Sequence, residues 1–177
     1  LYCSTDNGST WTKVKNPAGP RWVVALDRYL YIGSGGGGAY GLYRSSNSGV
    51  SWDTLSPGRI DCDALAVKGD VDVLFVGTSD NLFRSSDLGA SWTELTSDFK
   101  AANVSCLVSV GGTLIAGGYT SFRSTNRGVT WVTTGGPVPY SLARCGTTVL
   151  MGAANGVLRS TDTGLTWLDA NTGLEAI

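Results

Sequence analysis

The chain has 177 residues, of which 42% are hydrophobic and 15% are charged, and it carries a formal net charge of −1 with no histidine. The lack of histidine excludes a Ser-His-Asp triad, a Cys-His dyad and every histidine-ligated metal site. The charge balance argues against a nucleic-acid partner, and no apolar run approaches the ~20 residues of a transmembrane segment.

An eight-residue phrase, read as Ser-x-Asp-x-Gly-x-Thr-Trp in its fullest form, occurs five times, and we call each copy a box. The boxes cover residues 4–11, 45–52, 85–92, 124–131 and 160–167. Each closes on a tryptophan, and these are Trp11, Trp52, Trp92, Trp131 and Trp167. Because the tryptophans recur every 36 to 41 residues, the sequence predicts a repeat protein.

Each position of the box has a physical role in a tight turn. A glycine always stands fifth, which indicates a backbone with positive φ. The third position offers a side-chain oxygen to the turn amides, and it holds Asp6, Asn47, Asp87, Asn126 and Asp162. Since asparagine also occurs there, the position needs an acceptor rather than a charge. The tryptophan is expected to bury its ring against the turn, so we interpret the boxes as structural.

The box resembles the Asp-box, or BNR, repeat of sialidases and several other β-propeller families, and the likeness covers all five copies. The resemblance implies that each box forms the turn between the third and fourth strands of a blade. It further implies that the boxes are structural and lie on the face away from the binding site.

The chain in order fits this architecture. Residues 1–15 predict a strand, a box and a second strand, and a Pro- and Gly-containing break follows at 16–20. Four strands are then expected at 22–26, 29–33, 41–45 and 52–55. The same pattern returns at 64–67, 71–77, 81–85 and 92–95, at 105–110, 113–118, 121–124 and 131–134, and at 140–145, 148–152, 156–160 and 167–170. Four strands and one box make a blade.

We therefore expect an all-β protein, a β-propeller of four-stranded antiparallel blades. The complete blades are predicted at 16–55, 56–95, 96–134 and 135–170, with a fifth split between 1–15 and 171–177. A five-bladed ring closed by both termini is favoured, and part of a larger ring is the alternative. Because the chain starts in mid-repeat, we also expect it to belong to a longer polypeptide or assembly.

Binding residues are expected on the loops opposite the boxes, since rigid scaffolds usually carry function on loops. The candidates are aromatic and basic residues near those loops, namely Arg21, Trp22, Tyr40, Arg59, Tyr119 and Tyr140. The glycine-rich segment 33–41 lacks the GK[ST] ending of a phosphate loop and is interpreted as an insertion. Arg44, Arg84, Arg123 and Arg159 each immediately precede a box, so their recurrence is attributed to the repeat.

The sequence offers weaker candidates for catalytic residues than for binding residues. Only Asp61, Asp63 and Asp80 are placed to form a carboxylate pair of the kind that glycosidases use. The resemblance to sialidases does not extend to their Phe/Tyr-Arg-Ile-Pro motif or their Tyr-Glu nucleophile pair. No metal site or cofactor is expected.

The cysteines and sequons leave the compartment open. Cys3, Cys62, Cys106 and Cys145 form no CxxC pair and are interpreted as small buried residues, with one disulfide as the alternative. Sequons at Asn7 and Asn103 permit glycosylation of a secreted chain.

The favoured function is a non-catalytic, extracellular binding or scaffold module for a glycan or protein partner. The alternatives are a sialidase- or xyloglucanase-like glycoside hydrolase fragment, and an assembly factor for a membrane protein complex similar to the propeller that helps build photosystem II.

Overall fold

The computed structural model describes residues 1–14, 20–34, 41–55, 73–78, 81–95 and 103–174, together with the backbone of 64–68. Every regular element within these ranges is a β-strand. No helix long and apolar enough to cross a membrane occurs in them.

The strands form one two-stranded sheet and four four-stranded sheets, all antiparallel and each ordered as in the chain. The first half-blade pairs β1 (Tyr2–Cys3) with β2 (Thr12–Lys13). The second blade contains β3 (Pro20–Leu26), β4 (Tyr29–Ser34), β5 (Gly41–Ser45) and β6 (Asp53–Leu55). The third contains β7 (Ala64–Lys68), β8 (Val73–Gly77), β9 (Leu82–Ser85) and β10 (Thr93–Glu94). The fourth contains β11 (Cys106–Val110), β12 (Thr113–Gly117), β13 (Ser121–Ser124) and β14 (Val132–Thr133). The fifth contains β15 (Ser141–Cys145), β16 (Thr148–Ala153), β17 (Gly156–Ser160) and β18 (Leu168–Asp169).

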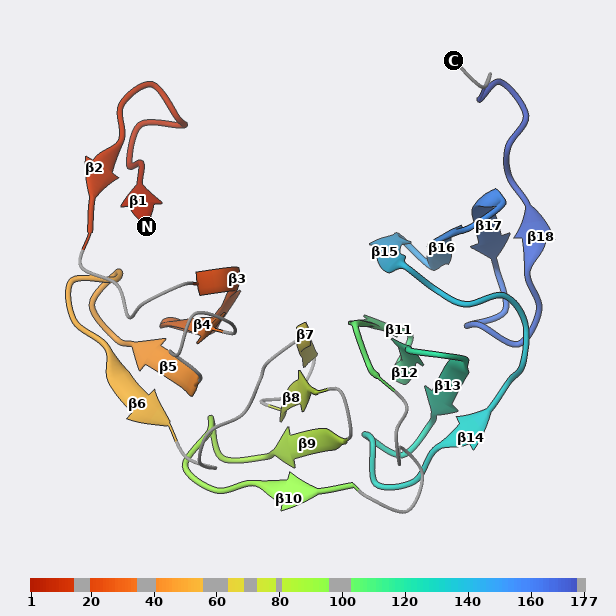
Figure 1. The fold of residues 1–177 in the computed structure, drawn as a ribbon, viewed down its shortest axis with the longest axis horizontal. Helices are drawn as coiled ribbons and strands as arrows, with labels where there is room; N and C mark the ends of the chain where they lie inside the picture. The colour runs from red at the N-terminus through yellow and green to blue at the C-terminus, as the bar shows by residue number, and fades with distance from the viewer. Residues whose placement is uncertain are drawn as a thin grey trace.

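The blades follow one another along an open arc (Figure 1). Their first strands, β3, β7, β11 and β15, line the inside and contact one another in sequence, while β6, β10, β14 and β18 run along the outside. The first half-blade and the fifth blade lie at the two ends of the arc, and the described residues do not close into a ring. Residues 175–177, which belong to the expected split blade, lie outside the described ranges.

The hydrophobic core lies between blades rather than within one sheet. Every residue of β8 and of β12 is buried, because each of these second strands is covered on both faces by neighbouring blades. One cluster joins Phe75 of the third blade to Leu114 and Trp131 of the fourth. Two similar clusters join the second blade to the third and the fourth to the fifth. Each blade therefore depends on its neighbours for burial.

A glycine near the end of the second strand lets the chain cross into the next blade. A Cβ added at Gly77 would lie 2.3 Å from the carbonyl oxygen of Val104, and one at Gly117 would lie 2.7 Å from Pro139. Only a residue without a side chain leaves room for these connections. The glycines thus fix where the segment before each inner strand runs.

Candidate functional site

The box is a turn held together by its own side chains. In the box at 85–92 the Ser85 hydroxyl accepts from the Gly89 amide at 2.8 Å, and Asp87 accepts from the Ser91 amide at 2.8 Å. The corresponding bonds from the glycine amide to the serine hydroxyl in the other four boxes measure 2.8 or 2.9 Å. The fourth residue has φ between 55° and 59° in every box, and it is Asn7, Ser48, Leu88, Arg127 or Thr163. The side-chain bonds hold a backbone that few residues adopt unaided.

Aspartate and asparagine at the third position of the box form different hydrogen bonds with the seventh residue. The Ser91 hydroxyl donates to Asp87, and this bond, followed by the Ser91 amide, lowers the pKa of the carboxyl to about 2. The equivalent threonine hydroxyl and amide lower the pKa of Asp6 and of Asp162 to about 2 as well. In the box of Asn126 the direction reverses, because its amide donates to the Thr130 hydroxyl at 2.8 Å. A rotating hydroxyl accommodates either side chain.

The box tryptophans differ in burial. Trp131 is 6% exposed and donates from Nε1 to the Gly128 carbonyl at 3.1 Å. Its ring packs edge to face against the Phe75 ring, with 6.0 Å between the ring centroids. Trp11 is 62% exposed, contrary to the expected burial of the ring. The reason is that Trp131 packs against Phe75 of the preceding blade, whereas Trp11 belongs to the half-blade that ends the described arc.

The arginines that precede the boxes join neighbouring blades, a role that the sequence analysis missed. Arg44 donates from Nη1 to the Leu88 carbonyl at 3.1 Å, and Arg84 donates from Nε to the Arg127 carbonyl at 3.0 Å. Arg123 donates to both the carbonyl and the hydroxyl of Thr163, each at 3.0 Å. Each acceptor is the positive-φ residue of the next box. Recurrence of arginine at one register position was the available signal, but it did not identify the acceptor.

The face opposite the boxes can be located from the topology. Because successive strands of a blade are antiparallel, the turns between third and fourth strands lie at one edge of the arc. The turns between second and third strands and the connections into the next blade lie at the other edge, and we call that edge the loop face. Arg21, Trp22, Tyr119 and Tyr140 lie at or beside it.

Tyr119 and Tyr140 are the exposed aromatic residues of the described loop face. They are 67% and 65% exposed. Tyr119 lies in the turn between β12 and β13, and Tyr140 precedes β15 in the next blade. Pro139 packs against Gly117, which brings the two segments together across the boundary between the fourth and fifth blades. Two largely exposed phenol rings therefore belong to one junction.

Trp22 and Arg21 contribute differently. The Trp22 ring covers Gly33, where a Cβ would lie 1.7 Å from the ring, and it packs on the core between the second and third blades. Trp22 is thus half-buried, while Arg21 is exposed on β3. The remaining candidates, Tyr40, Arg59, Asp61, Asp63 and Asp80, lie outside the described residues.

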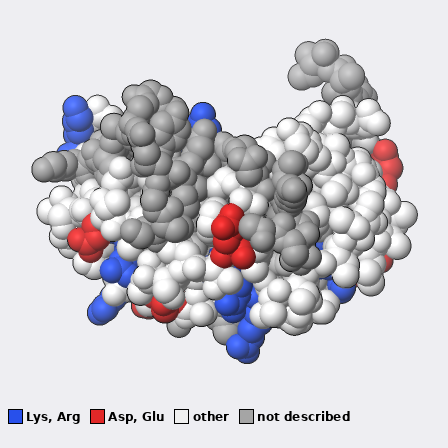
Figure 2. Space-filling view, turned by 60° about the horizontal axis from the view of Figure 1, so that its bottom comes forward, with Lys and Arg blue, Asp and Glu red and all other residues white. Residues whose placement is uncertain are grey.

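Charged groups do not gather over the described part of the convex surface. Lysine and arginine side chains and aspartate and glutamate side chains are scattered there, with uncharged residues between them (Figure 2). In the described ranges no group of three or more histidine, cysteine, aspartate or glutamate residues is arranged to hold a metal ion.

The described cysteines are free thiols. Cys145 is exposed rather than buried, because the inner strand β15 belongs to the blade at the end of the described arc. Cys106 is half-buried, and burial raises the pKa of its thiol to about 11. Cys62 lies outside the described residues.

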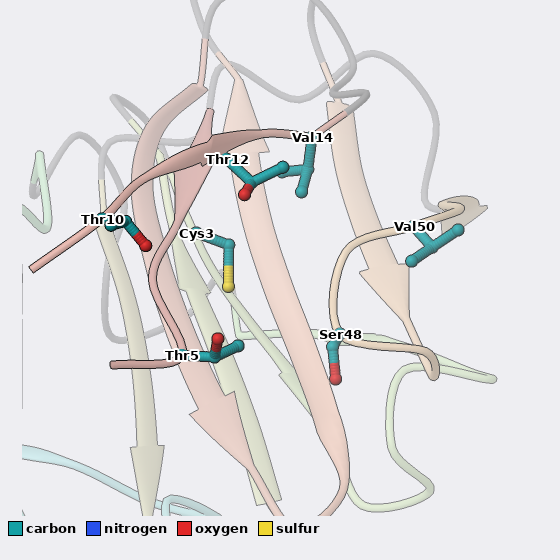
Figure 3. A pocket seen from close by; sticks show the side chains of 7 residues that line it. All are labelled: Cys3, Thr5, Thr10, Thr12, Val14, Ser48 and Val50. Carbon is teal, nitrogen blue, oxygen red and sulfur yellow. The ribbon is translucent and has the colours of Figure 1, made fainter. Parts of the chain in front are cut away.

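A cavity of about 230 Å³ lies between the first half-blade and the second blade (Figure 3). Five of its lining residues come from the half-blade, and they are Cys3, Thr5, Thr10, Thr12 and Val14. The other two, Ser48 and Val50, come from the second box. It lies away from the loop face, at the same kind of blade boundary that the arginines bridge elsewhere.

No protein-family model and no curated protein sequence matches the chain. The fold is similar to several solved structures. A GH74 enzyme of Niastella koreensis gives a TM-score of 0.73 at 20% identity, covering 94% of this chain and 28% of the enzyme. The extracellular domain of the one-component system BT4673 from B. thetaiotaomicron gives 0.71 at 15% identity, covering 89% and 23%. YCF48 bound to D1 peptide gives 0.66 at 13% identity, covering 88% and 54%.

These similar structures are β-propellers, and the chain shares their all-β, antiparallel architecture. It spans about a quarter of the length of the first two and about half of the third.

Proposed function

We propose that the chain is a non-catalytic, extracellular binding module that recognises a glycan or protein partner through its loop face. The observation that carries the proposal is the junction of Tyr119 and Tyr140, two rings about two-thirds exposed on adjoining blades. Phenol rings supply large contact area at little cost in conformational entropy, and they stack on the apolar faces of sugars or anchor a protein.

The rigidity of the surroundings supports this role. The connection that leads to Tyr140 is held by the close approach of Pro139 to Gly117, and the Tyr140 amide donates to the Gly152 carbonyl at 2.8 Å. The turn of Tyr119 is closed by a bond of 3.0 Å from the Gly118 amide to the Thr120 carbonyl. A ligand would therefore meet rings on ordered backbone, which reduces the entropic cost of binding.

Two of the similar structures support parts of this proposal. YCF48 is bound to a peptide, which favours a protein partner, and BT4673 contributes an extracellular domain, which agrees with a location outside the cell. A glycoside hydrolase fragment is the second candidate, because GH74 enzymes share the fold. Its catalytic residues would be Asp61, Asp63 and Asp80.

A glycan array combined with a hydrolysis screen separates the two functions. We expect binding without product, with binding lost in Tyr119→Ala and Tyr140→Ala. Product that disappears in Asp61→Asn or Asp63→Asn would instead establish a hydrolase. If no glycan binds, capture of a peptide or protein that depends on Tyr119 and Tyr140 remains the expected result.

Tyr2→Ala is the matched control for these variants. Tyr2 is 58% exposed but lies on β1 at the end of the arc, away from the junction. Equal loss of binding in Tyr2→Ala and Tyr119→Ala would mean that the loop-face assignment is wrong.

A further inference from the structure

Neighbouring blades are joined by an arginine-to-carbonyl hydrogen bond at every boundary except the first. At three boundaries the arginine before one box donates to the carbonyl of the positive-φ residue in the next box. At the first boundary the register places Cys3 where the arginine should stand and Ser48 where the acceptor should stand. Among the described residues no donor reaches the Ser48 carbonyl.

The cavity between the first half-blade and the second blade lies at this first boundary, where Cys3 stands in place of the arginine. Both Cys3 and Ser48 line it, so the space that an arginine side chain would fill is open (Figure 3). Its volume of about 230 Å³ is below the ~300 Å³ at which pockets for drug-sized ligands begin, which fits a side chain or a small molecule.

The lining suits a guanidinium group with an apolar stem. Val14 and Val50 offer aliphatic contact, and the threonine hydroxyls offer hydrogen-bond partners. The Ser48 carbonyl has the register of the carbonyls that accept from arginine at the other boundaries. Thr10 also donates to the carboxylate of Asp6 at 2.6 Å, which places a negative charge behind the wall of the cavity. The three occupied boundaries show that carbonyl acceptors suffice for an arginine at this register.

We propose that this cavity is a binding site for a guanidinium group, supplied by an arginine side chain of a peptide or by a small guanidine. The bound group would donate to the Ser48 carbonyl, as Arg44, Arg84 and Arg123 donate to the corresponding carbonyls. The site is independent of the loop face, so its ligand need not be the partner that Tyr119 and Tyr140 recognise.

The test is a titration of the full chain with N-acetyl-arginine amide, followed by amide chemical shifts. We expect saturable shifts at Ser48 and Val50, and weaker binding of N-acetyl-citrulline amide, whose neutral ureido group also donates hydrogen bonds but has no charge for the Asp6 carboxylate to attract. Cys3→Arg should abolish the shifts by filling the cavity, whereas Cys3→Ser should keep them. Absence of saturable shifts at Ser48 and Val50, equal shifts with citrulline, or shifts that persist in folded Cys3→Arg would overturn the proposal.

A second variant keeps the test decisive if Cys3→Arg does not fold. Arg123→Ala opens the equivalent space beside Thr163, and we expect it to gain saturable shifts there. No gain would count against the guanidinium site. Methylguanidinium and an arginine tripeptide distinguish the sources, since tighter binding of the peptide, by about tenfold or ~1.4 kcal/mol, indicates a protein side chain. Equal affinity indicates a small guanidine.

Discussion

At the scale of single residues, the box works through hydrogen bonds that tolerate two side-chain types at one position. Asp87 accepts from the Ser91 amide and hydroxyl, while Asn126 accepts from the Thr130 amide and donates to its hydroxyl. The ionised carboxylate accepts stronger, charge-assisted hydrogen bonds, whereas the neutral amide supplies an N–H donor of its own. The two forms differ in their response to acid.

Asp87→Asn should have a small effect on the melting temperature at pH 7 and remove part of the sensitivity to acid. The folded pKa of Asp87 is about 2 against an ordinary value of 3.8, so its contribution is complete above about pH 4 and is lost as pH falls towards 2. The melting temperature of the unsubstituted chain should therefore fall more steeply than that of Asp87→Asn between pH 5 and pH 2, so that two values close at pH 7 separate in acid. Asn126→Asp, as the reverse control, should acquire the same sensitivity. A difference that stays constant with pH would contradict this account.

Trp131→Ala should destabilise the chain by about 3–5 kcal/mol, because it empties a buried site against Phe75. Trp11→Ala makes the same change at the same box position, but its ring is 62% exposed, so the loss should stay below about 1 kcal/mol. Chemical denaturation measures both. Losses of equal size would show that the tryptophan acts within its own turn rather than between blades.

At the scale of elements, each blade is joined to the next by an arginine that reaches across the boundary. Arg123→Ala removes two hydrogen bonds to Thr163 and should cost about 1–3 kcal/mol of unfolding free energy. Arg159 occupies the same place in the fifth blade, but its side chain is exposed and makes no hydrogen bond to another described residue. Arg159→Ala should therefore change stability by no more than about 0.5 kcal/mol, and a comparable loss would refute the role of the bridge.

The sequence predicted the strands well and the contacts between blades poorly. Alternating apolar residues and the recurring box placed β5, β13 and β17 at their observed bounds, since both signals are local. The bond from Arg44 to Leu88 joins residues 44 positions apart, and nothing local identifies such an acceptor. The exposure of Trp11 and the half-buried ring of Trp22 also depend on which blades lie beside them.

The candidate site shows the same division. Tyr119 and Tyr140 were selected as aromatic residues near turns, but their shared junction depends on the packing of Pro139 against Gly117. The cavity beside Cys3 could not be predicted, because it arises from one repeat departing from the register of the others.

At the scale of the whole molecule, the arc is a chain of mutually dependent blades rather than a single core. Second strands flanked by neighbours on both faces, such as β8 and β12, are entirely buried. The two-stranded sheet of β1 and β2 lies at one end of the described arc, and three of its four strand residues are exposed. Stability should therefore fall from the middle of the arc towards the half-blade.

Native-state hydrogen exchange should reveal this gradient. Amides of β8 and β12 are expected to exchange slowest, and those of β1 and β2 fastest, because a two-stranded sheet is marginally stable alone. Uniform protection along the arc would instead indicate a single cooperative unit.

Recognition through the loop face is the central claim, and it is tested most directly by the affinity of a Tyr119→Ala/Tyr140→Ala double variant. The ligand is the glycan or peptide selected with the wild-type chain, and calorimetric titration measures the dissociation constant. We predict at least a tenfold weakening, or about 1.4 kcal/mol, with the melting temperature unchanged, because both rings are largely exposed. An unchanged dissociation constant, or an equal weakening in Tyr2→Ala, would contradict the claim.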